Sequence, residues 1–193
     1  MTKIPSNELI DLLLEVGKLK EVIRTGWAKK GVSNPESVAE HTWRVALLAL
    51  VLSPQLKINQ PKSIKMSLIH DLGEVLSGDT VWEKGELVIG SQKKKHDTEK
   101  AAIQNLFKDN PSFKGYIDLW EEFESQNTKE SKAVKLFDKL EMLIQAYEYE
   151  KRGLNKEPLQ EFWDNVEKYL KNTELELYLE ELKTLRKNSP KSA

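Results

Sequence analysis

Apolar residues recur with a helical period along most of the chain, and the pattern is most informative between residues 61 and 78. Pro61 is placed to open a helix there and Gly78 to end it. The apolar stripe of this helix consists of Ile64, Leu68, Leu72 and Val75. His70 and Glu74 are four residues apart, and Asp71 and Glu74 are three apart. We therefore predict that one imidazole and two carboxylates share a face of this helix.

The N-terminal half carries two further helical patterns. An amphipathic helix is predicted over residues 6–20, and a second runs from Asn34-Pro35 to about Leu52. Residues 24–31 contain two glycines and are expected to be irregular, and residues 80–90 are expected to form a loop. A helix is expected to follow from about residue 91.

The C-terminal half continues with helices. A short aromatic helix follows Pro111, a long helix capped by Asn127-Thr128 ends before Gly153, and another begins at Glu157-Pro158. Residues 173–176, Thr-Glu-Leu-Glu, have the pattern of a capping box for the last helix. No segment alternates with period two for long enough to predict a strand. The predicted fold is all-α, a single compact bundle of about seven helices in one domain over residues 1–193.

Composition narrows the class of protein. Lys and Arg number 30 and Asp and Glu 31, for a net charge of −1, which argues against a general nucleic-acid binder. There is no cysteine, so disulfides and thiolate metal sites are excluded. No apolar run approaches the ~20 residues of a membrane span, and the first residues lack a secretory signal pattern. These features predict a soluble cytoplasmic protein that is not bound to a membrane.

The His70-Asp71 pair is a candidate metal site. Burying carboxylates is costly unless a cation compensates, and consecutive helical residues diverge by only ~100°, so both side chains can turn toward one ion. The alternative is the polar edge of a surface helix. His41 lies on the apolar stripe of its helix, and the alternative there is a core histidine bonded to a backbone carbonyl. Asp138 lies off the main apolar stripe of the helix that precedes Gly153, and the alternative is a surface carboxylate.

Four blocks of sequence carry a resemblance to a known family. They are RTGW at residues 24–27, PESVAEHTWR at 35–44, HDLGEVLSGD at 70–79 and KLFDKLE at 135–141. Their order and spacing resemble those of the HD-domain metal-dependent phosphohydrolases, and among them the small 5'-deoxynucleotidases. The resemblance covers residues 9–153 and departs around residues 80–95. The C-terminal helices, residues 158–187, carry no motif and are expected to pack on the core or on a dimer partner.

The resemblance implies a metal-dependent enzyme that forms homodimers. His41, His70, Asp71 and Asp138 would bind one divalent metal ion, and imidazole with carboxylate suits Mn, Co, Fe, Ni or Zn. The substrate would be a small nucleotide, a deoxyribonucleoside 5'-monophosphate, from which water releases phosphate.

The resemblance also implies roles for four residues beyond the metal ligands. Glu74 would take a proton from the attacking water, and Arg24 would clamp phosphate oxygens with its planar fork of donors. Asp79 would accept a hydrogen bond from the 3'-hydroxyl, and Trp27 would crowd the 2' position. For Trp27 the alternative is a core aromatic.

Two other functions stay open. One is another HD-type nucleotide phosphohydrolase or phosphodiesterase, acting on a cyclic or pyrophosphorylated nucleotide, although three histidines are few for a His-rich centre. The other is a regulatory module in which the metal is structural. Arg24 and Glu74 argue against that module, because a purely structural site needs neither.

Overall fold

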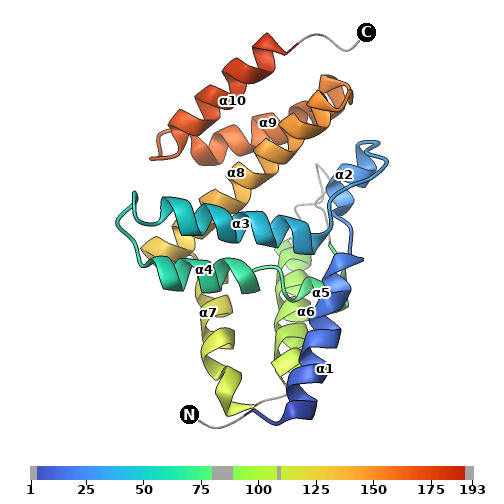
Figure 1. Ribbon diagram of the computed structural model, residues 1–193, viewed down its shortest axis with the longest axis vertical. Coiled ribbons are helices and arrows are strands. Elements are labelled where there is room, and N and C mark those ends of the chain that lie inside the picture. Colours follow the sequence, from blue (N-terminus) through green and yellow to red (C-terminus); the bar gives the residue numbers. More distant parts are fainter. Residues whose placement is uncertain (1–3, 80–88, 108–109, 190–193) are drawn as a thin grey trace.

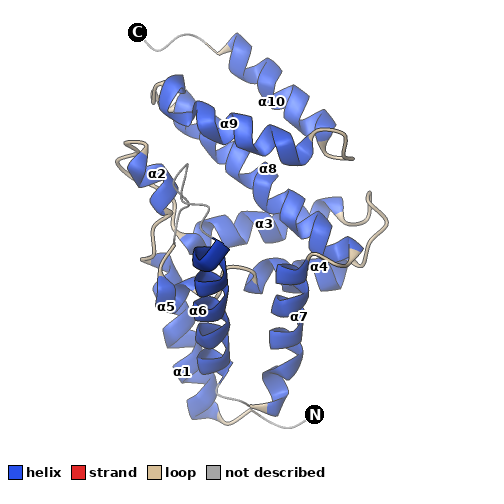
Figure 2. Cartoon of the chain, turned by 180° about the vertical axis from the view of Figure 1, so that it is seen from behind, coloured by secondary structure: helices blue, strands red, loops and turns tan. Residues whose placement is uncertain are grey.

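The computed structural model describes residues 4–79, 89–107 and 110–189, and over these residues it contains helices and no strand (Figures 1 and 2). The α-helices are α1 (Ser6–Gly17), α2 (Thr25–Lys29), α3 (Val38–Leu52), α4 (Gln60–Ile69), α5 (Glu74–Ser77), α6 (Ile89–Phe107), α7 (Lys114–Ser125), α8 (Lys129–Lys151), α9 (Lys156–Leu170) and α10 (Glu176–Asn188). Two short 3₁₀ helices, Lys18–Lys20 and Pro111–Phe113, precede α2 and α7. The predicted all-α fold is confirmed, and most of the predicted loop at residues 80–90 lies outside the described residues.

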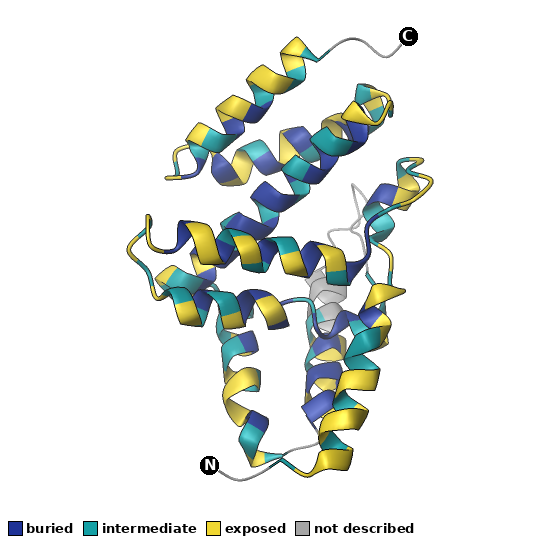
Figure 3. Ribbon diagram, in the orientation of Figure 1, coloured by how far each residue is buried: buried dark blue, intermediate teal, exposed yellow. Residues whose placement is uncertain are grey.

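Helices α3 and α4 lie side by side across the middle of the molecule, and α8 packs against both (Figure 1). Helices α9 and α10 pack on α8 at one end of the molecule, and α1, α6 and α7 extend toward the opposite end of the molecule. The main core cluster joins α3, α4 and α8 through residues such as Val45, Met66 and Leu140. Figure 3 shows α8 as the most continuously buried helix, whereas α1 exposes much of its surface. None of the helices in the described ranges is long and apolar enough to cross a membrane.

Helix α3 begins three residues later than Asn34-Pro35 predicts. Ser37 is its N-cap and forms a capping box with Glu40, in which Ser37 Oγ accepts from Glu40 N at 3.2 Å. The preceding residues are instead held by backbone pairing with an earlier segment: Arg24 N donates to Glu36 O at 2.9 Å, and Val38 N donates to Val22 O at 2.8 Å. The predicted start is wrong because this pairing occupies the backbone that the helix would have used. It also brings Arg24 beside the start of α3.

The predicted continuous helix over residues 61–78 is also wrong. Helix α4 does begin where Pro61 indicates, with Asn59 as its N-cap, but it ends at Ile69, and a turn separates it from α5. Gly73 in this turn lies so close to α6 that a Cβ atom would come within 3.1 Å of Glu99 O. The chain therefore bends to pack α5 against α6, and His70 and Asp71 leave the regular helix.

Two other local predictions differ from the structure. Residues 24–31 were expected to be irregular, but Thr25–Lys29 form the short helix α2. The capping box predicted at Thr173–Glu176 is absent, because α10 begins only at Glu176 and Thr173 Oγ1 accepts instead from Leu175 N at 3.2 Å. By contrast, the N-cap predicted for the long helix is confirmed: Thr128 caps α8, and Gly153, with φ of 100°, follows its end.

Candidate metal centre and active site

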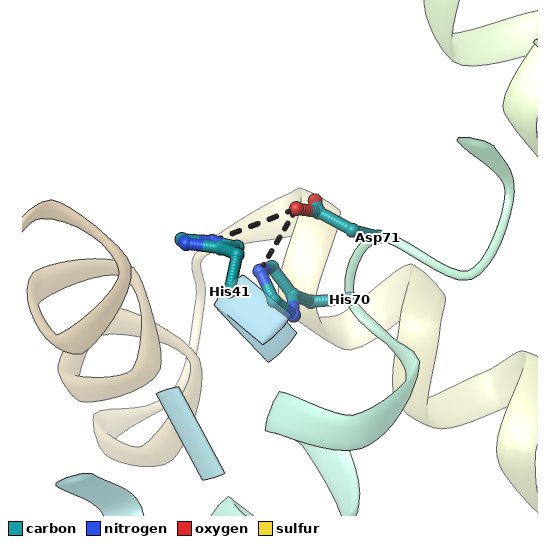
Figure 4. Close-up of side chains that lie close together, drawn as sticks. All are labelled: His41, His70 and Asp71. Atoms are coloured by element: carbon teal, nitrogen blue, oxygen red, sulfur yellow. Dashed lines mark ion pairs between the residues drawn. The ribbon is translucent and has the colours of Figure 1, made fainter. Parts of the chain in front are cut away.

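His41, His70 and Asp71 come together from three elements (Figure 4). His41 lies in the second turn of α3, His70 caps the C-terminus of α4, and Asp71 follows in the turn. Asp71 Oδ2 is 3.3 Å from His70 Nε2 and 3.7 Å from His41 Nε2. The break after Ile69 lets the two consecutive side chains turn toward the same point.

Asp138, on α8, approaches this group at His41, while the group whose ligand atoms all lie within 4.8 Å of one another contains only His41, His70 and Asp71. The Oδ1 atom of Asp138 lies 3.4 Å from His41 Nε2, and the residue is 5% exposed, so it is not a surface carboxylate. Its other oxygen is 3.3 Å from both Lys135 Nζ and Lys139 Nζ. The two lysines compensate the charge at Oδ2 and leave Oδ1 facing His41.

Both imidazoles are oriented by their Nδ1 atoms. His70 Nδ1 donates to Ser67 O at 2.7 Å, and His41 Nδ1 donates to the carboxylate of Glu141. Each ring therefore presents Nε2 to the centre, and within the described part of the chain neither buried Nε2 atom has a hydrogen bond. Buried polar atoms are rarely left in this way, and two such nitrogens facing two carboxylates match the donor set of a divalent metal ion. The residues present therefore fit a metal.

The electrostatics keep both carboxylates ionised. Burial alone would raise the pKa of Asp71, but His70 and Arg24 outweigh it and hold that pKa well below the ordinary value. At Asp138, burial would likewise raise the pKa, but the charges of Lys139 and Lys135 outweigh it, and the pKa of this carboxyl also lies well below its ordinary range. At neutral pH both side chains are therefore in the form that a metal ion binds.

The pKa of His41 shifts in the opposite direction. Burial and the nearby Arg24 would lower its pKa, but the contacts with Glu141 and Asp138 outweigh them and raise the pKa to about 10. In the absence of a metal ion this ring is therefore a proton-binding site between carboxylates. Since a metal must displace that proton, we expect metal binding at His41 to weaken as the pH falls.

Arg24, Glu74 and Asp79 border the same centre. Arg24 Nη1 donates to Asp71 Oδ2 at 3.2 Å and lies 3.5 Å from Asp79 Oδ1. Asp79 is held in turn by α2, because its Oδ2 accepts from Thr25 N at 2.6 Å. Glu74 is the buried first residue of α5, and its charge acts on Arg24. The fold thus brings Asp71 and Asp79 to Arg24, with Glu74 close enough for its charge to act on the same guanidinium.

Trp27 lies apart from this group. It is 1% exposed, its ring packs against Tyr149 and Phe162, and its Nε1 donates to Glu36 Oε1 at 2.9 Å. These contacts are those of a core aromatic. The hydrogen bond of the indole leads toward His41 through Glu36, which neighbours His41 and whose pKa burial and Glu141 raise to about 7.

Sequence reasoning missed Glu36, Arg44 and Glu141. Glu141 is fully buried against His41, and Arg44 Nε lies 3.1 Å from its Oε1. A signal for two of them was present in the sequence, because Arg44 and Glu141 each lie three residues after a predicted ligand on a helix. That spacing places them on the ligand's face.

Comparisons with known proteins agree with this geometry. A family model described as "HD domain" matches residues 16–177. The 5'-deoxynucleotidase HDDC2 of Xenopus laevis is 39% identical in an alignment of 172 residues that covers 86% of this chain and 82% of that protein. The protein of the same name from Dictyostelium discoideum is 41% identical over 163 residues, 78% of this chain and 83% of that one. A conserved hypothetical protein from Pyrococcus furiosus has a similar structure, with a TM-score of 0.72, 40% identity, and coverage of 92% of this chain and 99% of that chain.

Proposed function

The chain belongs to the HD-domain family, and from this premise we propose that it is a metal-dependent 5'-deoxynucleotidase. It would hydrolyse a deoxyribonucleoside 5'-monophosphate to the deoxyribonucleoside and phosphate. The observation that carries the proposal is the pair of buried Nε2 atoms of His41 and His70, which lack hydrogen bonds and face two ionised carboxylates. Relatives named 5'-deoxynucleotidase that align with most of the chain support the substrate class.

His41, His70, Asp71 and Asp138 would hold one divalent metal ion. Two imidazoles and two carboxylates suit Mn, Co, Fe, Ni or Zn and disfavour a soft ion. When bound, such an ion polarises the phosphoryl group and lowers the pKa of a bound water. The chain supplies the dry surroundings, since both histidines and Asp138 are buried.

Arg24 would bind the phosphate. Its guanidinium carries five N–H donors in a planar fork, and the described contacts with Asp71 and Asp79 both use Nη1. The same contacts orient the fork beside the ligands. Arg24 would thus set the phosphorus atom in line with the attacking water.

Glu74 would act as the general base. It would accept one proton from the water as the new P–O bond forms and the bond to the 5'-oxygen breaks, and that proton would then pass to the departing 5'-oxygen to give the deoxyribonucleoside. Its position supports this role, because it opens α5 directly after the turn that contains Asp71 and is buried within the site.

The experiment that tests this proposal is a phosphate-release assay over a panel of nucleotides, with the metal-stripped protein and with each metal added back. Deoxyribonucleoside 5'-monophosphates should release phosphate, and only when metal is present. Hydrolysis confined to cyclic or pyrophosphorylated nucleotides would replace the proposal with another HD-type phosphohydrolase. Stoichiometric metal with no turnover on any substrate would replace it with a regulatory module.

Deoxyribose selection is proposed to depend on Asp79 and Trp27. Asp79, which Thr25 and Arg24 hold in place, would accept a hydrogen bond from the 3'-hydroxyl. Trp27, which lies with Thr25 on α2, would exclude a 2'-hydroxyl. We expect a high ratio of kcat/KM for dAMP over AMP in the wild type, and a fall toward unity in Trp27→Ala. Asp79→Ala should instead weaken both substrates, by ~1–3 kcal/mol.

The buried indole makes a milder variant necessary. Removing a core aromatic costs roughly 3–5 kcal/mol of stability, so Trp27→Phe is measured beside Trp27→Ala. A ratio that stays high in both folded variants would leave Trp27 with a role in packing alone and locate the selectivity elsewhere. A wild-type ratio near one would leave a general nucleotidase.

We also propose that residues 1–193 form a single HD domain that acts as a cytoplasmic homodimer. The family match to residue 177 and the packing of α9 and α10 in the main core support one domain.

Exposed apolar side chains on α3, including Trp43 at 64% exposure, support pairing of two copies. A solution mass near 22.2 kDa, that of one chain, would contradict the dimer. A composition without cysteine, and so without disulfides, supports the cytoplasmic location.

A further inference from the structure

Helices α3 and α8 meet along a row of polar side chains that leads away from the metal centre. We call it the polar seam: His41 and Arg44 on α3, with Glu141, Gln145 and Glu148 on α8. Arg44 is at its middle, with Nε 3.1 Å from Glu141 Oε1, Nη1 3.0 Å from Glu148 Oε1, and Nη2 bonded to Gln145 Oε1. Arg44, Gln145 and Glu148 line a surface cavity of about 840 Å³, so the outer end of the seam is reached from solvent.

Glu141 is the inner end of the seam and is 0% exposed. Burying a carboxylate is costly unless it is paired and hydrogen-bonded. Glu141 has one partner of each kind: its Oε2 accepts a hydrogen bond from His41 Nδ1, and its Oε1, which has no hydrogen bond among the described residues, forms an ion pair with Arg44. Since both partners come from one face of α3, the carboxylate fixes this helix against α8 and limits the rotation of the imidazole.

We propose that Glu141 is a positioning residue for the metal ligand His41, and that Arg44 holds Glu141 in place. The carboxylate keeps the proton on Nδ1 and turns Nε2 toward Asp71 and Asp138. Groups of this kind commonly orient histidines that bind metals and raise their basicity. This inference rests on the proposed function, because it concerns a ligand of the proposed metal.

The two histidines differ in a way that makes the inference testable. His70 is oriented by a backbone carbonyl, that of Ser67, which no substitution removes. His41 is oriented by a side chain one turn beyond Asp138 on α8. One helix therefore supplies a proposed ligand and also orients a second from α3, so we expect a change at Glu141 to affect the metal through His41, the proposed ligand that it contacts.

The test compares Glu141→Ala and Glu141→Gln with a matched control, Glu148→Ala. Glu148 contacts the same arginine but lies at the solvent end of the seam. Zn²⁺ affinity is measured by competition with a chelator. Glu141→Ala should bind Zn²⁺ about 10–100-fold more weakly, the scale of losing such a partner. Glu141→Gln should lose less, because its amide oxygen still accepts from Nδ1, and Glu148→Ala should bind as the wild type does.

A second measurement reports on the ring itself. In the wild type the buried Nδ1–H proton of His41 should give a slowly exchanging downfield NMR resonance, with or without Zn²⁺. It should vanish in Glu141→Ala and move upfield in Glu141→Gln, where the acceptor is neutral. If Glu141→Ala fails to fold, the shift and affinity of Glu141→Gln still decide the matter. Wild-type affinity and an unmoved resonance in Glu141→Gln would overturn the inference.

These readouts separate the inference from the proposed function. If the wild type binds none of the Mn, Co, Fe, Ni and Zn ions but the Nδ1–H resonance depends on Glu141, the metal proposal fails and the positioning of His41 stands. If His70→Ala abolishes Zn²⁺ binding while both Glu141 variants bind as the wild type does, the metal proposal stands and the inference is overturned.

Discussion

Replacing His70 by alanine is expected to empty the metal centre and to reduce phosphate release roughly 10³-fold or more. The substitution removes one of four proposed ligands, and the catalysis attributed to a bound ion amounts to several kcal/mol, at 1.36 kcal/mol for each factor of ten. The variant also leaves Asp71 without one of the contacts that lower its pKa. Elemental analysis of the purified protein and the phosphate-release assay measure the two effects independently.

The chain offers a matched control for this substitution in His96. This histidine lies on α6, stacks on Trp120 and pairs with Glu124 at 3.3 Å. His96→Ala should therefore keep both metal and activity. If His70→Ala retains a stoichiometric amount of metal, His70 is not a ligand and the assignment of the centre fails.

Replacing Glu74 should separate chemistry from metal binding. Glu74→Ala is expected to keep its metal and to lose about 10²-fold or more in kcat, the scale of a general acid–base contribution. Glu74→Gln keeps the size of the side chain but cannot take a proton, so it should be similarly slow. Metal content and kcat measured on the same preparations provide the test. A fully active Glu74→Ala enzyme with normal metal content would refute the role.

Replacing Arg24 separates catalysis from metal binding less directly. Its contact with Asp71 at 3.2 Å means that a substitution removes a phosphate donor and also disturbs a proposed ligand. We therefore expect Arg24→Ala to lose activity together with part of its metal affinity. Glu74 is not one of the predicted metal ligands, so its substitution tests catalysis separately from metal binding.

Local signals in the sequence determined most of the helices. Thr128 and Gly153 bound α8 as predicted, and Asn59 with Pro61 starts α4, because caps and proline act within one turn of backbone. Two of the failures lie where distant segments compete for the same backbone. Pairing of Arg24 with Glu36 delays the start of α3, and the close approach of Gly73 to Glu99 interrupts the helix predicted over residues 61–78.

The sequence by itself also determined which side chains could bind a metal, since the order of His41, His70-Asp71 and Asp138 carries the family resemblance. Only the tertiary structure decided how those side chains are held. His41 and Glu141 are 100 residues apart, and their contact depends on the packing of α3 against α8. The burial of Trp27 against Tyr149 and Phe162 likewise follows from how α2, α8 and α9 meet. The period of a helix specifies which residues share its face but leaves open which face of another helix it meets.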